Sequence, residues 1–162
     1  MSKSLARVSA ALQAAGLAIT PIEMAAETRT AEQAAAAAGC SLDQIAKSIV
    51  FAGESGQLYL FLTAGGNQVD AQKAAELAGE SLGRADIAEL RRVTGFAIGG
   101  VAPLGHLTPL PVFMDPRLMD FAEIWAAAGT PRHIFPIAPQ DLLAASGAKL
   151  AAFAKVGAPL DR

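Results

Sequence analysis

The sequence predicts a mixed α/β fold, and three observations lead to that prediction. The chain has 162 residues, of which 52% are hydrophobic, and this is enough for one compact core. Apolar runs over 48–52 and 58–63 flank a glycine-containing turn at 53–56, which is the pattern of a β-hairpin. Helix-capping residues and glycines alternate with further apolar runs, so helices interrupt strands. We therefore expect residues 1–162 to form a single α/β domain.

Several segments carry the signals of short helices. Apolar residues recur at three- and four-residue spacing from Leu5 to Ala15, and Gly16 ends the pattern. Capping side chains such as Thr30 and Ser41, each followed three residues later by a glutamine, mark the starts of others. The helices expected after the first span 31–38, 42–47, 70–77 and 86–94, and a last one begins near 139.

The remaining apolar segments predict strands. We expect a short strand within 18–24 and, after the hairpin, strands over 111–115, 123–128 and 133–138. The segment 95–111 holds five glycines or prolines in its first eleven residues, so it cannot form one long regular element. We expect a strand, a sharp loop and an extended arm there. The last residues, 157–162, are expected to form a frayed tail.

Composition limits where the protein works and what it binds. The net charge of −2 and the pI near 5.6 exclude the global basicity of general nucleic-acid-binding proteins, so any RNA contact must be local. The single cysteine, Cys40, excludes an internal disulfide and suits a reducing compartment. No secretory signal or membrane-spanning run is evident, so we expect a cytoplasmic protein with no membrane partner.

Most standard catalytic motifs are missing from the sequence. The turn at 53–56 does not have the spacing of a serine-hydrolase elbow, and His106 and His133 have no metal-ligand spacing. Gly99-Gly100 is not followed by the residues of a phosphate-binding loop. We therefore expect no metal and no cofactor, while a dyad of Cys40 with a histidine stays open beside the commoner role of a packed cysteine.

Lys47 stands where the expected helix 42–47 meets a very apolar strand. One interpretation is structural: a cation at a helix C-terminus complements the helix dipole while its stem covers apolar surface. The other is functional, although structural lysines greatly outnumber functional ones. Gly99 and Gly100 have the same two interpretations, either a tight strand connection or a backbone that offers N–H donors to a ligand.

A larger pattern of residues resembles the YbaK/ProX family, the freestanding relatives of the editing domain inserted in bacterial prolyl-tRNA synthetases. The resemblance extends from about Glu27 to Gly147, which is most of the chain. The segments that carry it are Asp43–Phe51, Asn67–Asp70 with Lys73, Thr94–His106, Leu110–Pro111 and Asp115.

This resemblance implies both a fold and an activity. The fold is a mixed, strongly curved β-sheet with helices around it. The activity is hydrolysis of the ester that joins a wrong amino acid to a tRNA, chiefly tRNA for proline. The family's essential lysine corresponds to Lys47, and its Gly-x-x-x-Pro loop corresponds to Gly99, Gly100, Val101, Ala102 and Pro103. The implied partners are the acceptor end of mischarged tRNA and a prolyl-tRNA synthetase.

The chain departs from the cysteine-specific YbaK branch at two positions. That branch has a serine and an aspartate where this chain has Ala127 and Ile134, which argues against cysteine specificity. The stretch Trp125–Pro131, with His133 close behind, resembles a branch proposed to remove small amino acids. Further candidates for substrate contact are Asn67, Gly129, Thr130 and His133; the alternative roles are turn residue for Asn67, strand-edge hydroxyl for Thr130 and surface histidine for His133.

The mechanism that we expect needs no covalent nucleophile. The Lys47 ammonium would hold a phosphate or ester oxygen, the backbone N–H groups of 99–102 would hold the aminoacyl group, and a positioned water would attack. The alternatives are a non-catalytic module that binds an aminoacyl or tRNA end, and a Cys-tRNA-Pro deacylase of the YbaK branch.

Overall fold

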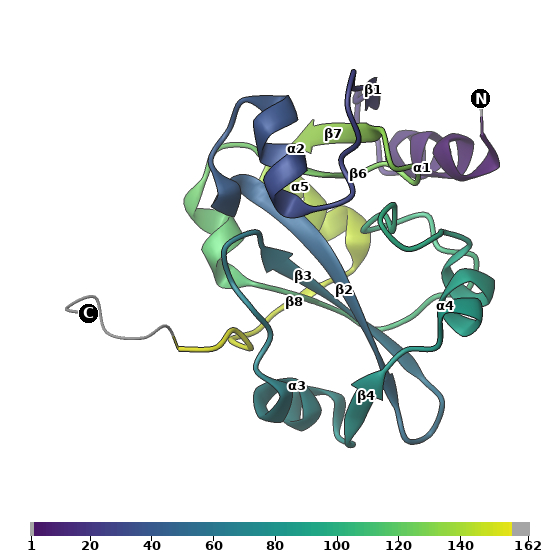
Figure 1. Cartoon of the computed structure of the whole chain (residues 1–162), viewed down its shortest axis with the longest axis vertical. Helices are drawn as coiled ribbons and strands as arrows, with labels where there is room; N and C mark the ends of the chain where they lie inside the picture. Colours follow the sequence, from purple (N-terminus) through teal and green to yellow (C-terminus); the bar gives the residue numbers. More distant parts are fainter. Residues whose placement is uncertain (1, 157–162) are drawn as a thin grey trace.

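The computed structural model describes residues 2–156 and contains one eight-stranded mixed β-sheet (Figure 1). The tail expected at 157–162 lies outside the described residues. The predicted α/β class is confirmed, and the hairpin expected at 48–63 is the longest part of the sheet. The strands are β1 (Ile22–Glu23), β2 (Ile45–Gly53), β3 (Leu58–Ala64), β4 (Leu82–Arg84), β5 (Val112–Met114), β6 (Ile124–Ala127), β7 (His133–Ile137) and β8 (Lys149–Leu150).

The hairpin of β2 and β3 lies at the centre of the sheet. The strand order is β1-β7-β6-β2-β3-β5-β8, and β4 pairs with β2 outside that path. Parallel pairs join β2 to β6 and β3 to β5, and antiparallel pairs join β2 to β3 and β6 to β7. Such mixed pairing requires crossover connections, which the helices and 3₁₀ turns of this chain supply.

The described residues also form five α-helices, and all five lie where the sequence predicts a helix. The expected caps Thr30 and Asp70 accept backbone N–H bonds at the starts of their helices, and four of the five helices end at a glycine. No helix in the described chain is long and apolar enough to cross a bilayer. The helices are α1 (Lys3–Ala14), α2 (Ala31–Ala38), α3 (Ala71–Ala78), α4 (Ile87–Thr94) and α5 (Pro139–Ser146).

The helix expected at 42–47 was a wrong prediction. Only one 3₁₀ turn, η1 (Leu42–Gln44), follows Ser41, and β2 begins at Ile45. The Gln44 Oε1 atom accepts bonds from Ser41 N and Oγ at 3.0 and 3.2 Å, so the capping pair is used by this short turn. The apolar, β-branched run from Ile45 then gains more from pairing with β3 and β6 than from extending the turn.

The strand expected at the start of 95–111 is also absent from the described structure. Residues 95–111 run from the end of α4 to β5 as an irregular connection. Its apolar residues are nevertheless buried: Phe96 and Ala102 are fully inaccessible to solvent. Burial therefore reflects packing against α1 and the sheet, not strand pairing.

The core has two main parts because β3 is buried on both faces. Leu60 and Leu62 pack into the larger cluster, which α1 and the connection 95–111 cover. Tyr59 and Phe61 point to the other face, where Phe61 stacks on Phe113 with ring centroids 5.2 Å apart. β2 lies beside β3, so its residues are held rigidly next to a fully buried strand.

Candidate functional site

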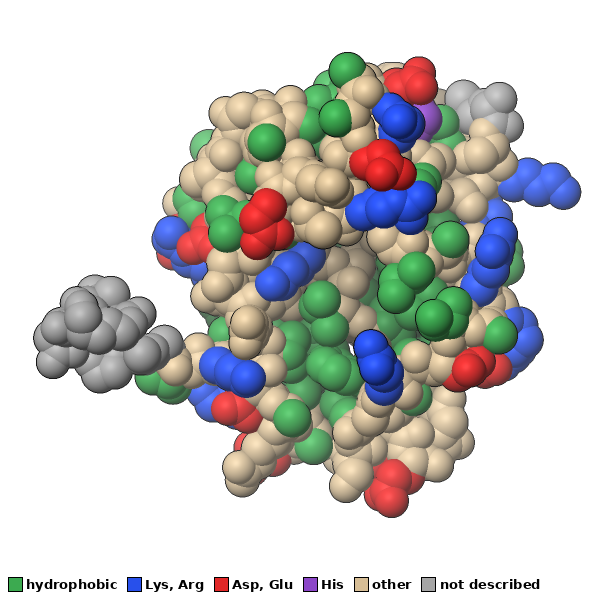
Figure 2. All heavy atoms as spheres, viewed as in Figure 1, with side chains coloured by type: hydrophobic (Ala, Val, Ile, Leu, Met, Phe, Trp, Pro, Cys, Tyr) green, Lys and Arg blue, Asp and Glu red, His purple; other side chains and the backbone are tan. Residues whose placement is uncertain are grey.

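A cavity of about 980 Å³ opens along β2, on the side away from β3. Its walls come from the start of α2, the middle of β2, the junction of β4 with α4, the loop at 98–101, and strands β6 and β7. Figure 2 shows a hollow near the middle of this face, with hydrophobic side chains inside it and Lys and Arg side chains around it. A concave, largely apolar site with a few polar groups is typical of a small-molecule or cofactor-sized ligand.

Lys47 lines this cavity and is the third residue of β2, not a helix-end cation. The structural alternative based on a helix dipole is therefore wrong. Its Nζ atom donates a hydrogen bond to the carbonyl oxygen of Gly65, 3.1 Å away in the loop after β3. No carboxylate forms an ion pair with Lys47 in the described chain, so its charge is available to a ligand.

The loop that holds Lys47 fits closely against η1. A Cβ atom added to Gly65 would lie 2.2 Å from the carbonyl oxygen of Leu42, a distance that no side chain could occupy. The next N–H group, of Gly66, donates to Asp43 Oδ1 at 2.8 Å. Position 65 therefore requires glycine because two backbone segments meet there.

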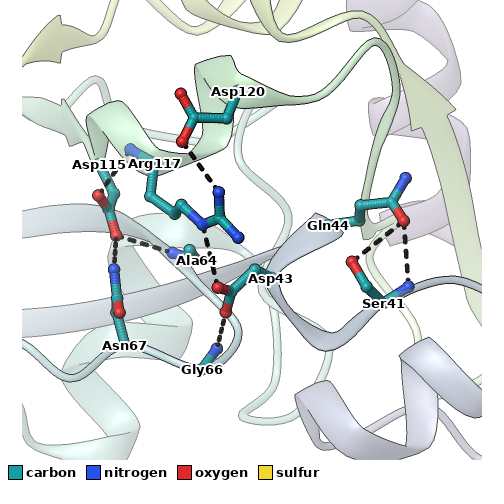
Figure 3. Close-up of polar contacts among 9 residues, drawn as sticks. All are labelled: Ser41, Asp43, Gln44, Ala64, Gly66, Asn67, Asp115, Arg117 and Asp120. Atoms are coloured by element: carbon teal, nitrogen blue, oxygen red, sulfur yellow. Dashed lines mark hydrogen bonds and ion pairs between the residues drawn. The ribbon is translucent and has the colours of Figure 1, made fainter. Parts of the chain in front are cut away.

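A polar network fixes the same loop from the other side (Figure 3). Asp115 is 3% exposed, and its Oδ2 accepts bonds from Ala64 N at 3.2 Å and Asn67 Nδ2 at 2.8 Å. Its Oδ1 accepts from Arg117 N at 3.0 Å, while the Arg117 guanidinium bonds the carboxylates of Asp43 and Asp120. Asn67 is not among the residues that line the cavity. Its amide instead holds the loop that carries the Lys47 acceptor.

The glycine-proline loop contributes two of its five residues to the cavity, Gly99 and Val101. Gly99 has a φ of +86°, and a Cβ atom there would lie 3.2 Å from Arg29 Cγ, so glycine allows both the turn and the close approach of the arginine. The N–H of Gly100 donates to Ala97 O at 3.1 Å and is not available to a ligand. Among the described residues, the N–H groups of Gly99 and Val101 have no such partner.

The rest of that loop is buried behind the cavity wall. Ala102 and Pro103 are buried, and neither lines the cavity. The Ala102 carbonyl oxygen lies 2.8 Å from His106 Nε2, so a neutral ring with its proton on Nε2 donates to it. Burial lowers the pKa of His106 below its ordinary value of 6.5, which favours the neutral ring.

The turn at 129–133 supports the loop but does not reach the cavity. A Cβ atom added to Gly100 would lie 3.1 to 3.2 Å from backbone atoms of Thr130, so these two segments pack together. Thr130 Oγ1 and His133 Nδ1 are 2.6 Å apart and form a hydrogen bond. Gly129, Thr130 and His133 are thus placed behind the wall, and their predicted contact with substrate stays untested.

Sequence reasoning missed that Arg29 and Arg84 lie in the same cavity as Lys47. Three cations line it, Arg29, Lys47 and Arg84, against one carboxylate, Asp86. The local field is positive although the chain has a net charge of −2. Arg29 precedes the Thr30 cap and pairs with Glu27 at 2.9 Å; no local motif signals that either arginine lies near Lys47.

Small and apolar side chains form the other part of the cavity. Ala127 and Ile134, the two positions at which the chain departs from the cysteine-specific branch, both line it. The apolar side chains of this part also include Ala31, Ala34, Ala46, Ala126 and Trp125. This arrangement offers a small side chain a fitting environment and offers a thiol or hydroxyl no polar partner at positions 127 and 134.

Cys40 lies apart from the cavity, and burial raises the pKa of its thiol. A thiol of that kind is a poor nucleophile. In the part of the chain that the structure describes, no group of three or more His, Cys, Asp or Glu residues is placed to hold a metal ion.

Comparisons with known proteins identify the family of this chain. Residues 25–145 match the model of a family described as the aminoacyl-tRNA editing domain. The uncharacterized protein YwhH of Bacillus subtilis (strain 168) is 33% identical over 120 residues, which are 74% of this chain and 76% of that protein.

Two crystal structures share the fold across almost their whole length. A proposed trans-editing enzyme for prolyl-tRNA synthetase is 47% identical, with a TM-score of 0.89 over 96% of this chain and 99% of that one. The hypothetical protein APE2540 is 26% identical, with a TM-score of 0.85 over 92% of this chain and 99% of that one. The resemblance inferred from the sequence is confirmed, and the chain belongs to the aminoacyl-tRNA editing domain family.

Proposed function

We propose that this protein is a trans-editing deacylase that hydrolyses the ester between a small non-cognate amino acid and tRNA, chiefly tRNA for proline. The observation that carries the proposal is that Lys47, Gly99 and Val101 line the same cavity. This cavity is lined by alanines and has more cationic than anionic side chains. Its volume of about 980 Å³ is sufficient for a terminal adenosine together with its aminoacyl group.

The cavity offers different chemistry to the different parts of such a substrate. Arg29, Lys47 and Arg84 suit the phosphate and ester oxygens of an RNA 3′ end. The N–H groups of Gly99 and Val101 are suited to the oxyanion that develops when water attacks the ester. The alanines offer apolar contacts to a short amino-acid side chain.

A positioned water molecule completes the mechanism. An aminoacyl ester is already reactive, so orientation of water and stabilisation of the oxyanion are sufficient for catalysis. The vicinal hydroxyl of the terminal ribose can relay the proton. Lys47 acts as a fixed positive charge, held in position by the Gly65 carbonyl oxygen, and needs no change of protonation.

The test is hydrolysis of a panel of mischarged tRNA-Pro carrying alanine, serine, cysteine or 2-aminobutyrate. We expect turnover of the small apolar members and a loss of about 100- to 1000-fold in kcat/KM for Lys47→Met, the cost typical of removing one oxyanion-stabilising group. The exposed Lys3→Met variant serves as a matched control, because Lys3 lies on α1 and does not line the cavity.

Three results would count against the proposal. Intact esters across the whole panel would leave a binding module as the better account. Unchanged turnover by Lys47→Met would remove the role of Lys47. Preferred hydrolysis of the cysteinyl ester would favour the cysteine-specific activity despite the apolar residues at 127 and 134.

A further inference from the structure

The edge of β2 next to the cavity has no strand partner among the described residues over 47–50, and Ser48 lies within this gap. β6 pairs with β2 only at Ile45 and Ala46, and β4 pairs with it only at Phe51 to Gly53. Figure 1 shows β6 near one end of β2 and β4 near the other. No strand of the described chain is paired with Ser48 on this side, where the cavity lies.

The backbone of Ser48 faces that gap. Ser48 lies opposite Leu62 of β3, and the Leu62 carbonyl oxygen accepts a bond from Asp115 N, on the side of Leu62 away from β2. Residues opposite one another in an antiparallel pair either both bond across the pair or both point away from it. The N–H and C=O groups of Ser48 are therefore directed away from β3, towards the open edge.

The side chain of Ser48 also lacks a partner. Three hydroxyl residues line the cavity, and two are committed: Thr28 Oγ1 donates to Pro131 O at 3.0 Å, and Thr30 Oγ1 accepts from Gln33 N at 3.1 Å. Ser48 Oγ is buried and makes no hydrogen bond. A buried hydroxyl without a partner is costly, and Ser48 is one of the residues that line the cavity.

These groups differ in character from the rest of the cavity. Most of the other polar groups described above are hydrogen-bond donors, which suit the oxygen atoms of a substrate. These donors are the side chains of Arg29, Lys47 and Arg84 and the backbone N–H groups of Gly99 and Val101. Ser48 adds acceptors: its carbonyl oxygen and its hydroxyl oxygen. Under the proposed function, the α-amino group is the one donor group in the aminoacyl part of a substrate with a small apolar side chain, and it needs acceptors.

We propose that the open edge of β2 at Ser48 binds the α-amino group of the substrate, with the Ser48 carbonyl oxygen and hydroxyl as acceptors. The edge thereby distinguishes an aminoacyl ester from an acyl ester without the amine. Asp86 is the one carboxylate that lines the cavity in the described chain, and its Oδ2 already accepts from Glu89 N at 3.0 Å at the start of α4.

The experiment measures binding to two stable analogues of the substrate. One is tRNA-Pro with an alanyl group in amide linkage at its 3′ end, and the other carries a propionyl group, which lacks only the α-amine. We expect wild type to prefer the alanyl amide, and Ser48→Ala to lose about tenfold or more in affinity for it while affinity for the propionyl amide is unchanged.

Two matched variants distinguish the role of the Ser48 hydroxyl from the general effect of substituting a serine. Ser48→Thr keeps the hydroxyl and a residue suited to a strand, so it should keep the preference. Ser81→Ala removes an exposed serine that does not line the cavity and should change neither affinity. Carbonyl ¹³C labelling of Ser48 provides a direct readout, because its NMR shift should move with the alanyl amide and not with the propionyl amide.

Each other outcome overturns the inference. Equal weakening of both amides, no change in either, or no binding of either by wild type would remove the assignment. Loss of the preference in Asp86→Asn but not in Ser48→Ala would transfer it to Asp86. Because the amides are not hydrolysed, a Ser48-dependent preference together with intact esters in the turnover panel would overturn the deacylase proposal alone.

Discussion

Lys47 Nζ donates a hydrogen bond to the carbonyl oxygen of Gly65, at 3.1 Å, and this bond joins the candidate catalytic group to a loop 18 residues further along the chain. The loop is fixed in turn by the bond between Asn67 Nδ2 and Asp115 Oδ2, at 2.8 Å. The position of the Lys47 charge therefore depends on residues that do not line the cavity.

Gly65→Ala should destabilise the protein and reduce its activity. The new Cβ would meet the Leu42 carbonyl oxygen at 2.2 Å, so the loop must move and carry the Lys47 acceptor with it. We expect a loss of about 1 to 3 kcal/mol in the free energy of unfolding, measured by urea denaturation. We also expect a fall in kcat that exceeds any change in KM.

Gly83→Ala is the matched control for that substitution. Gly83 lies in β4, and a Cβ atom there would have no neighbour within 4 Å. The free energy of unfolding of Gly83→Ala should stay within about 0.5 kcal/mol of that of wild type. Equal effects of the two substitutions would show that the contact with Leu42 does not constrain the loop.

Arg84→Ala should weaken tRNA binding in a salt-dependent way. Arg84 lines the cavity and forms no ion pair within the described residues, so its charge is free to neutralise a phosphate. We expect the slope of log Kd against log salt concentration to decrease by about 1, the value for one lost phosphate contact. Fluorescence anisotropy across a NaCl series measures this slope.

Arg91 provides the comparison for Arg84. It is an exposed cation on α4 that does not line the cavity. Arg91→Ala should leave both the affinity and the salt slope close to those of wild type. A slope that changes equally in the two variants would mean that general surface charge, rather than the cavity, attracts the RNA.

His106→Gln should reduce the dependence of stability on pH. Burial lowers the pKa of His106 in the folded protein, so the unfolded chain binds this proton more readily. The stability contributed by the neutral ring is complete above the ordinary pKa of 6.5 and decreases as the pH falls below it. Glutamine does not titrate and can still donate to the Ala102 carbonyl oxygen.

Urea unfolding of both proteins at pH 7.5 and pH 5.5 checks this expectation. The difference between the two pH values should be larger for wild type than for His106→Gln. His133, the other histidine of the chain, is present in both proteins and therefore does not contribute to the difference between them. An identical difference in the two proteins would show that His106 does not carry this dependence.

The sequence alone determined most of the secondary structure, because its signals are local. A capping threonine such as Thr30 and a glycine such as Gly39 act within one helix, and the continuous apolar run of β3 is itself a local strand signal. The helix expected at 42–47 failed because strand pairing with distant residues competes with a local cap. The family resemblance predicted that Lys47 and the loop at 99–103 belong to one site.

Tertiary structure alone decided which of those residues meet in the cavity. The gap at Ser48 exists because β6 and β4 pair with opposite ends of β2, and those partners lie about 80 and 30 residues away along the chain. The same folding brings Arg29 against Gly99 and turns Asn67 towards Asp115. Contacts between residues so distant in sequence have no local signal, so sequence patterns could name the lysine but not the charges and the open strand edge around it.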